Sequence, residues 1–273
     1  MPSYPPEFWA VAIFALVLVG IAKAGFGSGP GLLATPLIAL TIPVAEAAAL
    51  LLPLLIIVDI FSVRHYYREY DRHSLNIILP AAVVGIVAGG FAFGYFSDHE
   101  RIMQIGIGVL ALIFVLFQVF RSLIFGAIAG HRPPAWLGMI LGAIGGFTST
   151  LAHAGGPPIT IYLLPQRLPR NLFVGTTVIT FFIINLVKLI PYSVLGLLQV
   201  GNLLTVLILS PFAFIGVRIG IYLNRRFEDA WFNRIIYVIL FLTGLQLVIG
   251  RSLLSPSSVE RLDIWHGPTY TRR

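Results

Sequence analysis

Cysteine is absent from the 273-residue chain, which excludes a disulfide, a thiolate metal ligand and a thiol nucleophile. Charged residues are also scarce, at 11%, against about a quarter in soluble domains. Lysine occurs only as Lys23 and Lys188. The N-terminal segment lacks the basic stretch that opens a signal peptide, so we expect the first hydrophobic segment to be retained. These scarcities point away from a soluble domain.

Hydrophobic residues make up 58% of the chain and gather into long runs separated by short polar loops. Several runs approach or exceed the roughly 18 residues that a membrane-spanning helix needs. A soluble core does not account for so many of them, so the sequence predicts an all-α, polytopic integral membrane protein. The runs are Phe8–Ala24, Ala47–Val63, Leu75–Phe96, Ile102–Phe120, Trp136–Leu151, Asn171–Leu189, Leu203–Leu223 and Ile235–Ile249.

The net charge of +7 comes from arginine-rich loops and does not indicate nucleic-acid binding. If each half has five segments, including the short runs Leu32–Ile42 and Ile159–Pro165, the loops alternate between two sides. One side has only Arg101 before the C-terminal tail, and the other has Arg64, Arg68, Arg72, Arg121, Arg132, Arg167, Arg170, Arg225, Arg226 and Arg234. The positive-inside rule makes the arginine-rich side cytoplasmic and places the N-terminus outside.

Two glycine- and proline-rich motifs interrupt the hydrophobic runs. The first break is Gly25-Phe26-Gly27-Ser28-Gly29-Pro30-Gly31, and the second break is His153-Ala154-Gly155-Gly156-Pro157-Pro158. Each break precedes an unusually short apolar run, and such a pair in two halves of a membrane chain is the best sequence pointer to a transport site. Close helix packing is the alternative, but it fits poorly because prolines and consecutive glycines interrupt a helix.

The breaks divide the chain into a first repeat (1–125), a second repeat (126–252) and a polar tail (253–273). At an offset of 126 residues, Asp59 falls on Asn185; the same register pairs Gly20 with Gly146, Gly29 with Gly155, Pro43 with Pro169, Tyr66 with Tyr192, Gly90 with Gly216 and Gly94 with Gly220. Five segments per half predict inverted repeats that include short broken half-helices. If the short runs re-enter the membrane instead, four spans per half predict parallel repeats.

The two breaks predict an anion-binding site. Prolines suit the first turn of a helix, so each break is expected to expose the N-terminus of a short half-helix near the middle of the membrane. Free N–H groups and the positive end of the helix dipole favour an anion there. Ser28, Ser149 and Thr150 are candidate hydroxyl donors, and the predicted cradle comprises Gly27, Ser28, Gly29, Pro30, Gly155, Gly156, Pro157 and Pro158.

Polar side chains inside the spans are further candidates, because their burial in a bilayer is expensive. Asn185 and Lys188 share a helix face at i, i+3 spacing, and Tyr192 extends that face by a turn. The alternative for Lys188 is that it reaches the interface by snorkelling. Lys23, Asp59 and Tyr192 are candidates for coupling or gating. Lys23 and Asp59 form a candidate pair, and Asp59 is also a candidate carrier of a coupling proton.

His153 adjoins the second break, where it could donate to an anion, relay a proton or cap a buried loop. The chain shows no metal-ligand cluster with helical spacing. Known enzyme motifs also fail, because Phe26 stands where an intramembrane serine protease pattern needs glycine, and Leu32 follows Gly31 where a phosphate loop needs lysine. We therefore predict neither an enzyme nor a cofactor.

The chain resembles the sulfite exporter TauE/SafE family from about Phe8 to Ile249. The residues that carry the resemblance are Gly29-Pro30-Gly31-Leu32-Leu33 with Pro36, then Gly155-Gly156-Pro157-Pro158, Tyr162, Arg170-Asn171-Leu172-Phe173, Asn185 and Lys188. The resemblance implies a bacterial inner-membrane transporter of sulfite or a small organosulfonate-type anion, with export as the expected direction.

The expected mechanism is alternating access without an ATP site, with H⁺ or Na⁺ as a candidate coupling ion. The expected partners are the small anion and the lipid bilayer, and the oligomeric state is left open. The alternatives are a carrier of a different small anion, an importer, and a membrane scaffold that transports nothing.

Overall fold

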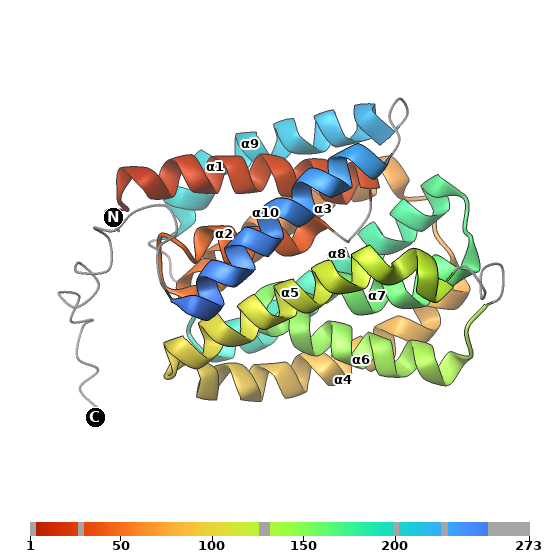
Figure 1. Ribbon diagram of the computed structural model, residues 1–273, viewed down its shortest axis with the longest axis horizontal. Helices are drawn as coiled ribbons and strands as arrows, with labels where there is room; N and C mark the ends of the chain where they lie inside the picture. Colours follow the sequence, from red (N-terminus) through yellow and green to blue (C-terminus); the bar gives the residue numbers. More distant parts are fainter. Residues whose placement is uncertain (1–3, 27–29, 126–131, 199–201, 225–228, 251–273) are drawn as a thin grey trace.

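The computed structural model describes residues 4–26, 30–125, 132–198, 202–224 and 229–250. Every regular element in these ranges is a helix (Figure 1), which confirms the predicted all-α class. The elements in chain order are α1 (Pro6–Ile21), η1 (Ala22–Phe26), η2 (Pro30–Leu33), α2 (Ala34–Ile38), α3 (Val44–Tyr66), α4 (Arg72–Ser97), α5 (Glu100–Phe125), α6 (Ala135–Ala152), α7 (Gly156–Leu163), η3 (Leu164–Gln166), α8 (Arg170–Val194), α9 (Asn202–Asn224) and α10 (Asp229–Ile249).

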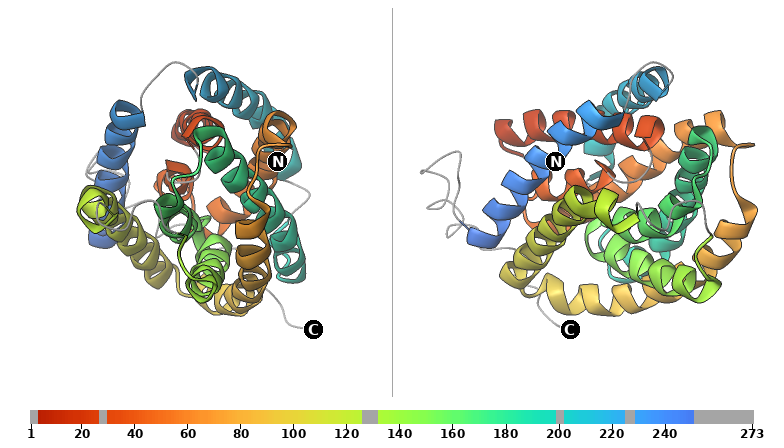
Figure 2. Two further views of the ribbon diagram at one scale, coloured as in Figure 1. Left: turned by 90° about the vertical axis from the view of Figure 1, so that its right-hand side faces the viewer. Right: turned by 45° about the vertical axis from the view of Figure 1, so that its right-hand side comes forward.

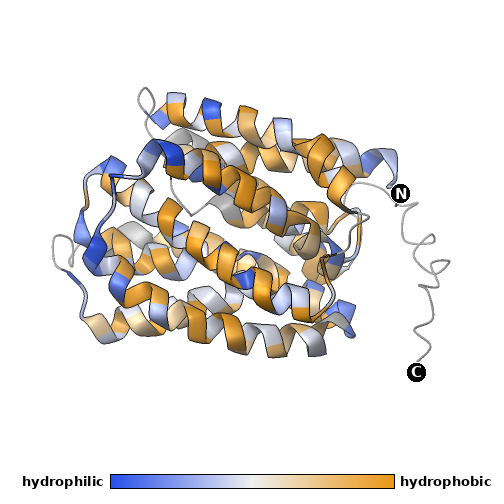
Figure 3. Cartoon of the chain, turned by 180° about the vertical axis from the view of Figure 1, so that it is seen from behind, coloured by the Kyte–Doolittle hydropathy of each residue, from blue (hydrophilic) through white to orange (hydrophobic). Residues whose placement is uncertain are grey.

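Seven helices among the described residues are long and apolar enough to cross a membrane. They are α1 continued by η1, α3, α4, α5, α6, α8 and α9, and each contains one of the predicted runs. The apolar part of α10, Arg234–Ile249, is shorter. Hydrophobic residues lie along the helices and hydrophilic ones gather mainly near the ends of the bundle (Figure 3). The chain is therefore a multi-pass membrane protein.

Proline marks where several helices begin. Pro5, Pro43, Pro134 and Pro169 occupy the N-cap positions of α1, α3, α6 and α8, each with an extended ψ near 150°. A proline in this position sacrifices little, because the first N–H groups of a helix have no intrahelical acceptor. The loop prolines therefore fix the helix starts that the hydrophobic pattern predicts.

The long helices pack in pairs, with α1 beside α9, α4 beside α6 and α5 beside α10, while α3 contacts α8 (Figures 1 and 2). Glycine allows the closest of these approaches. A Cβ atom on Gly20 of α1 would lie 2.8 Å from the backbone of Gly216 in α9, and one on Gly146 of α6 would lie 2.1 Å from the carbonyl oxygen of Ala82 in α4. These contacts explain the glycine spacing outside the two breaks.

The gapless register of the two halves does not extend to α4 and α9. Gly216 packs against α1, whereas a Cβ atom on Gly90, its counterpart in that register, would lie 2.9 Å from the side chain of Pro191 in α8. Gly94 likewise faces Leu195 at the end of α8, whereas its counterpart Gly220 faces Ile21 of the first half. The loop before α9 is longer than the loop before α4. The offset that aligns α3 with α8 therefore does not also align α4 with α9.

The two ends of the bundle carry different polar networks. At the end that holds Arg64, Arg68, Arg72, Arg167 and Arg170, here called the arginine-rich end, Asp71 caps α4 by accepting the amide of Ser74 at 2.9 Å. Arg132 donates to Asp71 at 3.2 Å, and the amide of Asp71 donates to Thr176 of α8 at 2.8 Å. Burial raises the pKa of Asp71, but the Ser74 hydrogen bonds and the Arg132 charge outweigh it and lower the pKa below its ordinary value.

At the opposite end, the Tyr4 hydroxyl donates to the Glu46 carboxylate at 2.8 Å. Burial, followed by this hydrogen bond and the Glu46 charge, raises the pKa of Tyr4 above its ordinary value. Arg101 donates to the last carbonyls of α10, at 2.8 Å from Leu247 and 2.6 Å from Val248. The one arginine predicted for this side before the tail therefore caps a helix C-terminus, where a cation is favoured.

The helices on either side of each break pack against each other. In the second half, Gly138 lies beside Tyr162 and Gly145 beside Ile159, so α6 and α7 run antiparallel. Gln166, after α7, donates to Ser74 at 3.2 Å, so this hairpin starts and finishes at the arginine-rich end. In the first half, α1 packs on α2, and the contact of Tyr4 with Glu46 closes that pair at the opposite end.

Candidate functional site

The first break begins as a π-helical turn, η1, at the inner end of α1. π-Helical turns occur often at functional sites, and this one carries Lys23, whose residue is 6% exposed. The Lys23 ammonium lies 2.5 Å from the Asp59 carboxylate of α3 and 5.6 Å from the centre of the Phe181 ring of α8. The predicted pair of Lys23 and Asp59 is thus present as a buried ion pair.

Asp59 also links α3 to α8. The side-chain amide of Asn185 donates to the second Asp59 oxygen at 2.6 Å. Asp59 is fully buried and Asn185 is 2% exposed. One carboxylate oxygen therefore forms a buried ion pair with Lys23, and the other accepts a buried hydrogen bond from Asn185. The two residues are the pair that the 126-residue register superimposes, and they touch each other.

The second break begins at His153, which ends α6 in the left-handed conformation with φ 54°. Histidine adopts this region more readily than most residues. Its Nε2 atom lies 2.8 Å from the carbonyl oxygen of Ala48 in α3, and its Nδ1 atom lies 2.7 Å from the Lys188 ammonium. A carbonyl only accepts, so Nε2 carries a proton, and Nδ1 is left to accept from Lys188.

Lys188 is fully buried against the C-terminal end of α6. Its ammonium donates to the Ser149 carbonyl at 3.0 Å and to the Ser149 hydroxyl at 3.1 Å, besides His153. These three acceptors match the three N–H donors of a lysine, and the negative end of the α6 dipole favours a cation there. The snorkelling alternative for Lys188 is therefore wrong, because its ammonium points into the protein.

Tyr192 lies behind the second break and fixes it. Its hydroxyl donates to the Thr150 carbonyl at 2.8 Å, near the end of α6. Tyr66 makes the corresponding bond to the carbonyl of Ala24, just before the first break, also at 2.8 Å. The Thr150 hydroxyl donates to the carbonyl of Gly146 at 2.9 Å, so it serves the α6 backbone rather than a ligand.

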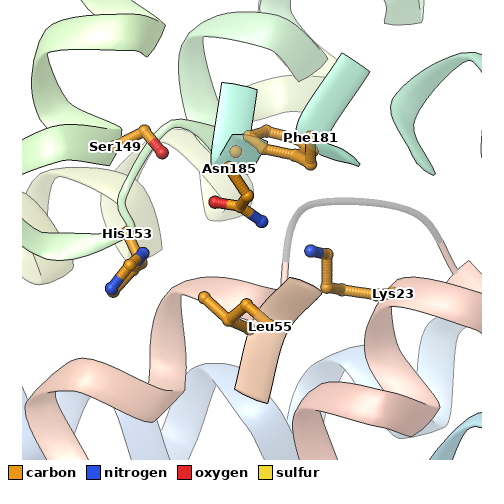
Figure 4. Close-up of a pocket in the computed structure, with 7 residues that line it drawn as sticks. Lys23, Leu55, Ser149, His153, Phe181 and Asn185 are labelled. Carbon is orange, nitrogen blue, oxygen red and sulfur yellow. The ribbon is translucent and has the colours of Figure 1, made fainter. Parts of the chain in front are cut away.

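A small cavity of about 20 Å³ lies between the second break and η1, the π-helical turn at which the first break begins. It exceeds the roughly 10–15 Å³ that one ordered water needs. The side chains around it come from both halves and point toward one another (Figure 4). The lining residues are Lys23, Leu55, Ser149, His153, Gly156, Phe181 and Asn185.

Some of the predicted site residues line the cavity, and others lie one contact away from it. Lys188 is one contact removed, behind Ser149 and His153, and Asp59 is reached through Lys23 and Asn185. Gly155 stands where no larger residue fits, because an added Cβ atom would lie 2.6 Å from the carbonyl oxygen of Gly145. The predicted cradle residues Gly27, Ser28 and Gly29 lie outside the described residues.

The prolines of the breaks occupy the predicted positions. Pro30 begins η2, while Gly156, Pro157 and Pro158 form the first turn of α7, with Gly155 as its N-cap. The elements η2 and α7 contact each other. Because Gly156 lines the cavity, the N-terminal end of α7, where the helix dipole is positive, faces it.

Sequence reasoning missed Leu55 and Phe181, which form the apolar part of the lining. Both stand four residues before a predicted polar residue, namely Asp59 and Asn185, on the same helix face. That spacing could have identified them. Sequence reasoning also did not single out Arg218, a charged residue within α9. The side chain of Arg218 is exposed and does not line the cavity.

The architecture and cavity define a polytopic membrane protein with a small cavity that polar and apolar side chains of both halves line. The model of the sulfite exporter TauE/SafE family matches residues 12–247, so the chain belongs to that family. The family consists of transporters, and membership implies transport of sulfite or a related sulfur-containing anion across a membrane. Neither the curated proteins nor the solved structures include a significant match to the chain.

Proposed function

We propose that the chain is a secondary transporter that binds sulfite, or a small organosulfonate-type anion, in the cavity between the two breaks. One observation carries the proposal: the groups around the cavity suit an oxoanion and converge from both halves of the chain. The ammonium of Lys23, the amide of Asn185 and the hydroxyl of Ser149 are hydrogen-bond donors. The N-terminal end of α7 adds a positive dipole.

A change of conformation accompanies binding in this proposal. Sulfite has four heavy atoms, whereas the cavity has room for about one or two waters. The anion therefore fits only if the surrounding helices or side chains separate. We take this tight arrangement as support for alternating access, in which the site closes between exposures to the two sides.

The two halves are proposed to be inverted repeats. The contacts between Asp59 and Asn185 support this, because residues that exchange under a two-fold rotation meet only near its axis. The hydrogen bonds from Tyr66 and Tyr192 support it too, since each joins residues 42 apart in its own half. The hairpins that start from opposite ends of the bundle are consistent with inversion.

We further propose that the protein lies in a bacterial inner membrane with the arginine-rich end in the cytoplasm and the N-terminus outside. The positive-inside rule supports this orientation. Export is the proposed direction, and H⁺ or Na⁺ is the proposed coupling ion. Asp59 and His153 are the candidate proton carriers, because both are buried and sit within hydrogen-bonding distance of a lysine ammonium.

Flux of labelled sulfite into proteoliposomes tests the proposal. We expect saturable flux that empty liposomes lack, that Lys188→Met abolishes, and that the lipid-exposed control Gly106→Ala retains, because a Cβ atom there meets nothing within 4 Å. Imposed H⁺ and Na⁺ gradients of either sign identify the coupling ion and the direction, and so distinguish export from import. Equal flux in the Lys188→Met variant would contradict the assigned site.

The same vesicles address the remaining alternatives. Counterflow with sulfate, thiosulfate and sulfoacetate in place of sulfite identifies a carrier of a different anion. A non-transporting scaffold gives no flux of any of these anions and no ligand-dependent thermal shift in the purified protein.

A further inference from the structure

The buried charges around the cavity are unequal in number. Among the residues whose side chains the structure describes, Asp59 is the only buried carboxylate, whereas both lysines of the chain are buried. Lys23 is paired with Asp59 at 2.5 Å. The partners of Lys188 are Ser149 and His153, neither of which supplies a negative charge.

His153 does not change this balance. Its Nε2–H donates to the carbonyl of Ala48, and its Nδ1 faces the ammonium of Lys188 at 2.7 Å. Two donors cannot face each other at this distance, so histidine and lysine together carry at most one positive charge. The three acceptors around the Lys188 nitrogen match the three N–H donors of an ammonium, so we place that charge on Lys188. Two lysines and one carboxylate then leave a single excess positive charge next to the cavity.

We infer that this cavity selects singly charged oxoanions over doubly charged ones of similar shape, with Asp59 as the residue that sets the preference; the inference rests on the proposed function. A bound monoanion neutralises the excess charge. A dianion leaves an uncompensated negative charge in a buried site, where charges interact far more strongly than in water. The favoured species are a sulfonate and hydrogensulfite, and the disfavoured ones are sulfate and sulfite dianions.

Substitutions can change the buried charge in single steps. Asp59→Asn adds one excess positive charge at nearly constant shape, and should move the preference toward the dianion. The double variant Lys23→Met/Asp59→Asn removes the whole ion pair and keeps the single excess charge, so its preference should match wild type at lower affinity. This double variant is the matched control for Asp59→Asn.

Calorimetric titration of the purified full-length protein tests the inference with three probes: methanesulfonate, which stays singly charged, sulfate, which stays doubly charged, and sulfite. For wild type we expect methanesulfonate to bind at least about tenfold more tightly than sulfate. Asp59→Asn should lower that ratio by about tenfold or more, and the double variant should restore it.

Sulfite gives a second measurement that needs no variant. Its affinity should rise as the pH falls and hydrogensulfite replaces the dianion. Methanesulfonate measured over the same pH range controls for titration of the surrounding protein groups, which are Lys23, Asp59, His153 and Lys188, and its affinity should change less than that of sulfite.

Three outcomes would overturn the inference. The first is wild type binding sulfate as tightly as methanesulfonate, and the second is an Asp59→Asn variant that binds both anions at the wild-type ratio. If Asp59→Asn does not fold, the wild-type comparisons decide alone. The third is that none of the probes shows saturable binding, which would overturn the proposed function and this inference with it. Binding without a charge preference would overturn only the inference.

Discussion

Replacing Asp59 by asparagine should destabilise the protein strongly. One carboxylate oxygen lies 2.5 Å from the Lys23 ammonium in an ion pair, and the other accepts from the Asn185 amide at 2.6 Å. Asparagine offers one oxygen, so its NH₂ group must face one of those two donors. Removing one partner of a buried ion pair costs about 3–5 kcal/mol, because the other charge is left uncompensated. We expect Asp59→Asn to lower the free energy of unfolding by an amount in that range.

The assay is equilibrium unfolding in mixed micelles, followed by tryptophan fluorescence, for wild type, Lys23→Met, Asp59→Asn and the double variant. The double variant removes both charges of the ion pair, so it should be at least about 2 kcal/mol more stable than the sum of the single losses predicts. An Asp59→Asn variant within about 1 kcal/mol of wild type, or a double variant with no such coupling, would refute an ionised and buried pair of Lys23 and Asp59.

Three further predictions concern the scaffold. Gly20→Val places new atoms against the backbone of α9, where even a Cβ atom would lie at 2.8 Å, so it should lose about 1–3 kcal/mol of unfolding free energy, while the control Gly106→Ala should lose none. Tyr192→Phe removes the buried hydrogen bond to α6 and should lose about 1–3 kcal/mol in the same assay; an unchanged value would contradict its anchoring role. The lowered pKa of Asp71 means that its stabilising contribution is complete above the unfolded pKa and is lost as the pH falls through the folded pKa. Wild type should therefore lose stability in acid relative to Asp71→Asn, and parallel pH profiles of the two proteins would contradict this.

Much of the fold was predictable because hydropathy alone determines which segments can cross a bilayer. Each long predicted hydrophobic run lies within one helix, except that the first continues from α1 into η1, and the prolines at 43, 134 and 169 mark helix starts. The direction of the short segments was not predictable. Whether α7 returns along α6 depends on the left-handed turn at His153 and on packing against Gly138 and Gly145, which a hydrophobic pattern does not encode.

The candidate site was predictable in part for a similar reason. Buried lysines, a carboxylate and an amide are rare enough in membrane spans to stand out individually. Their pairing is a tertiary property: the sequence does not say that Lys23 reaches Asp59 while Lys188 reaches Ser149. It also does not reveal which of them line the cavity.

The central claim is that the buried cavity between the two breaks binds a sulfur oxoanion with the help of Lys188. Equilibrium binding of labelled sulfite to the purified protein tests it most directly. We predict one saturable site per chain, competed by methanesulfonate, present in Gly106→Ala and lost in Lys188→Met, because Lys188 supplies the excess positive charge and holds Ser149 and His153 in place. Saturable binding that is unchanged in Lys188→Met, or no binding in wild type, would contradict the claim.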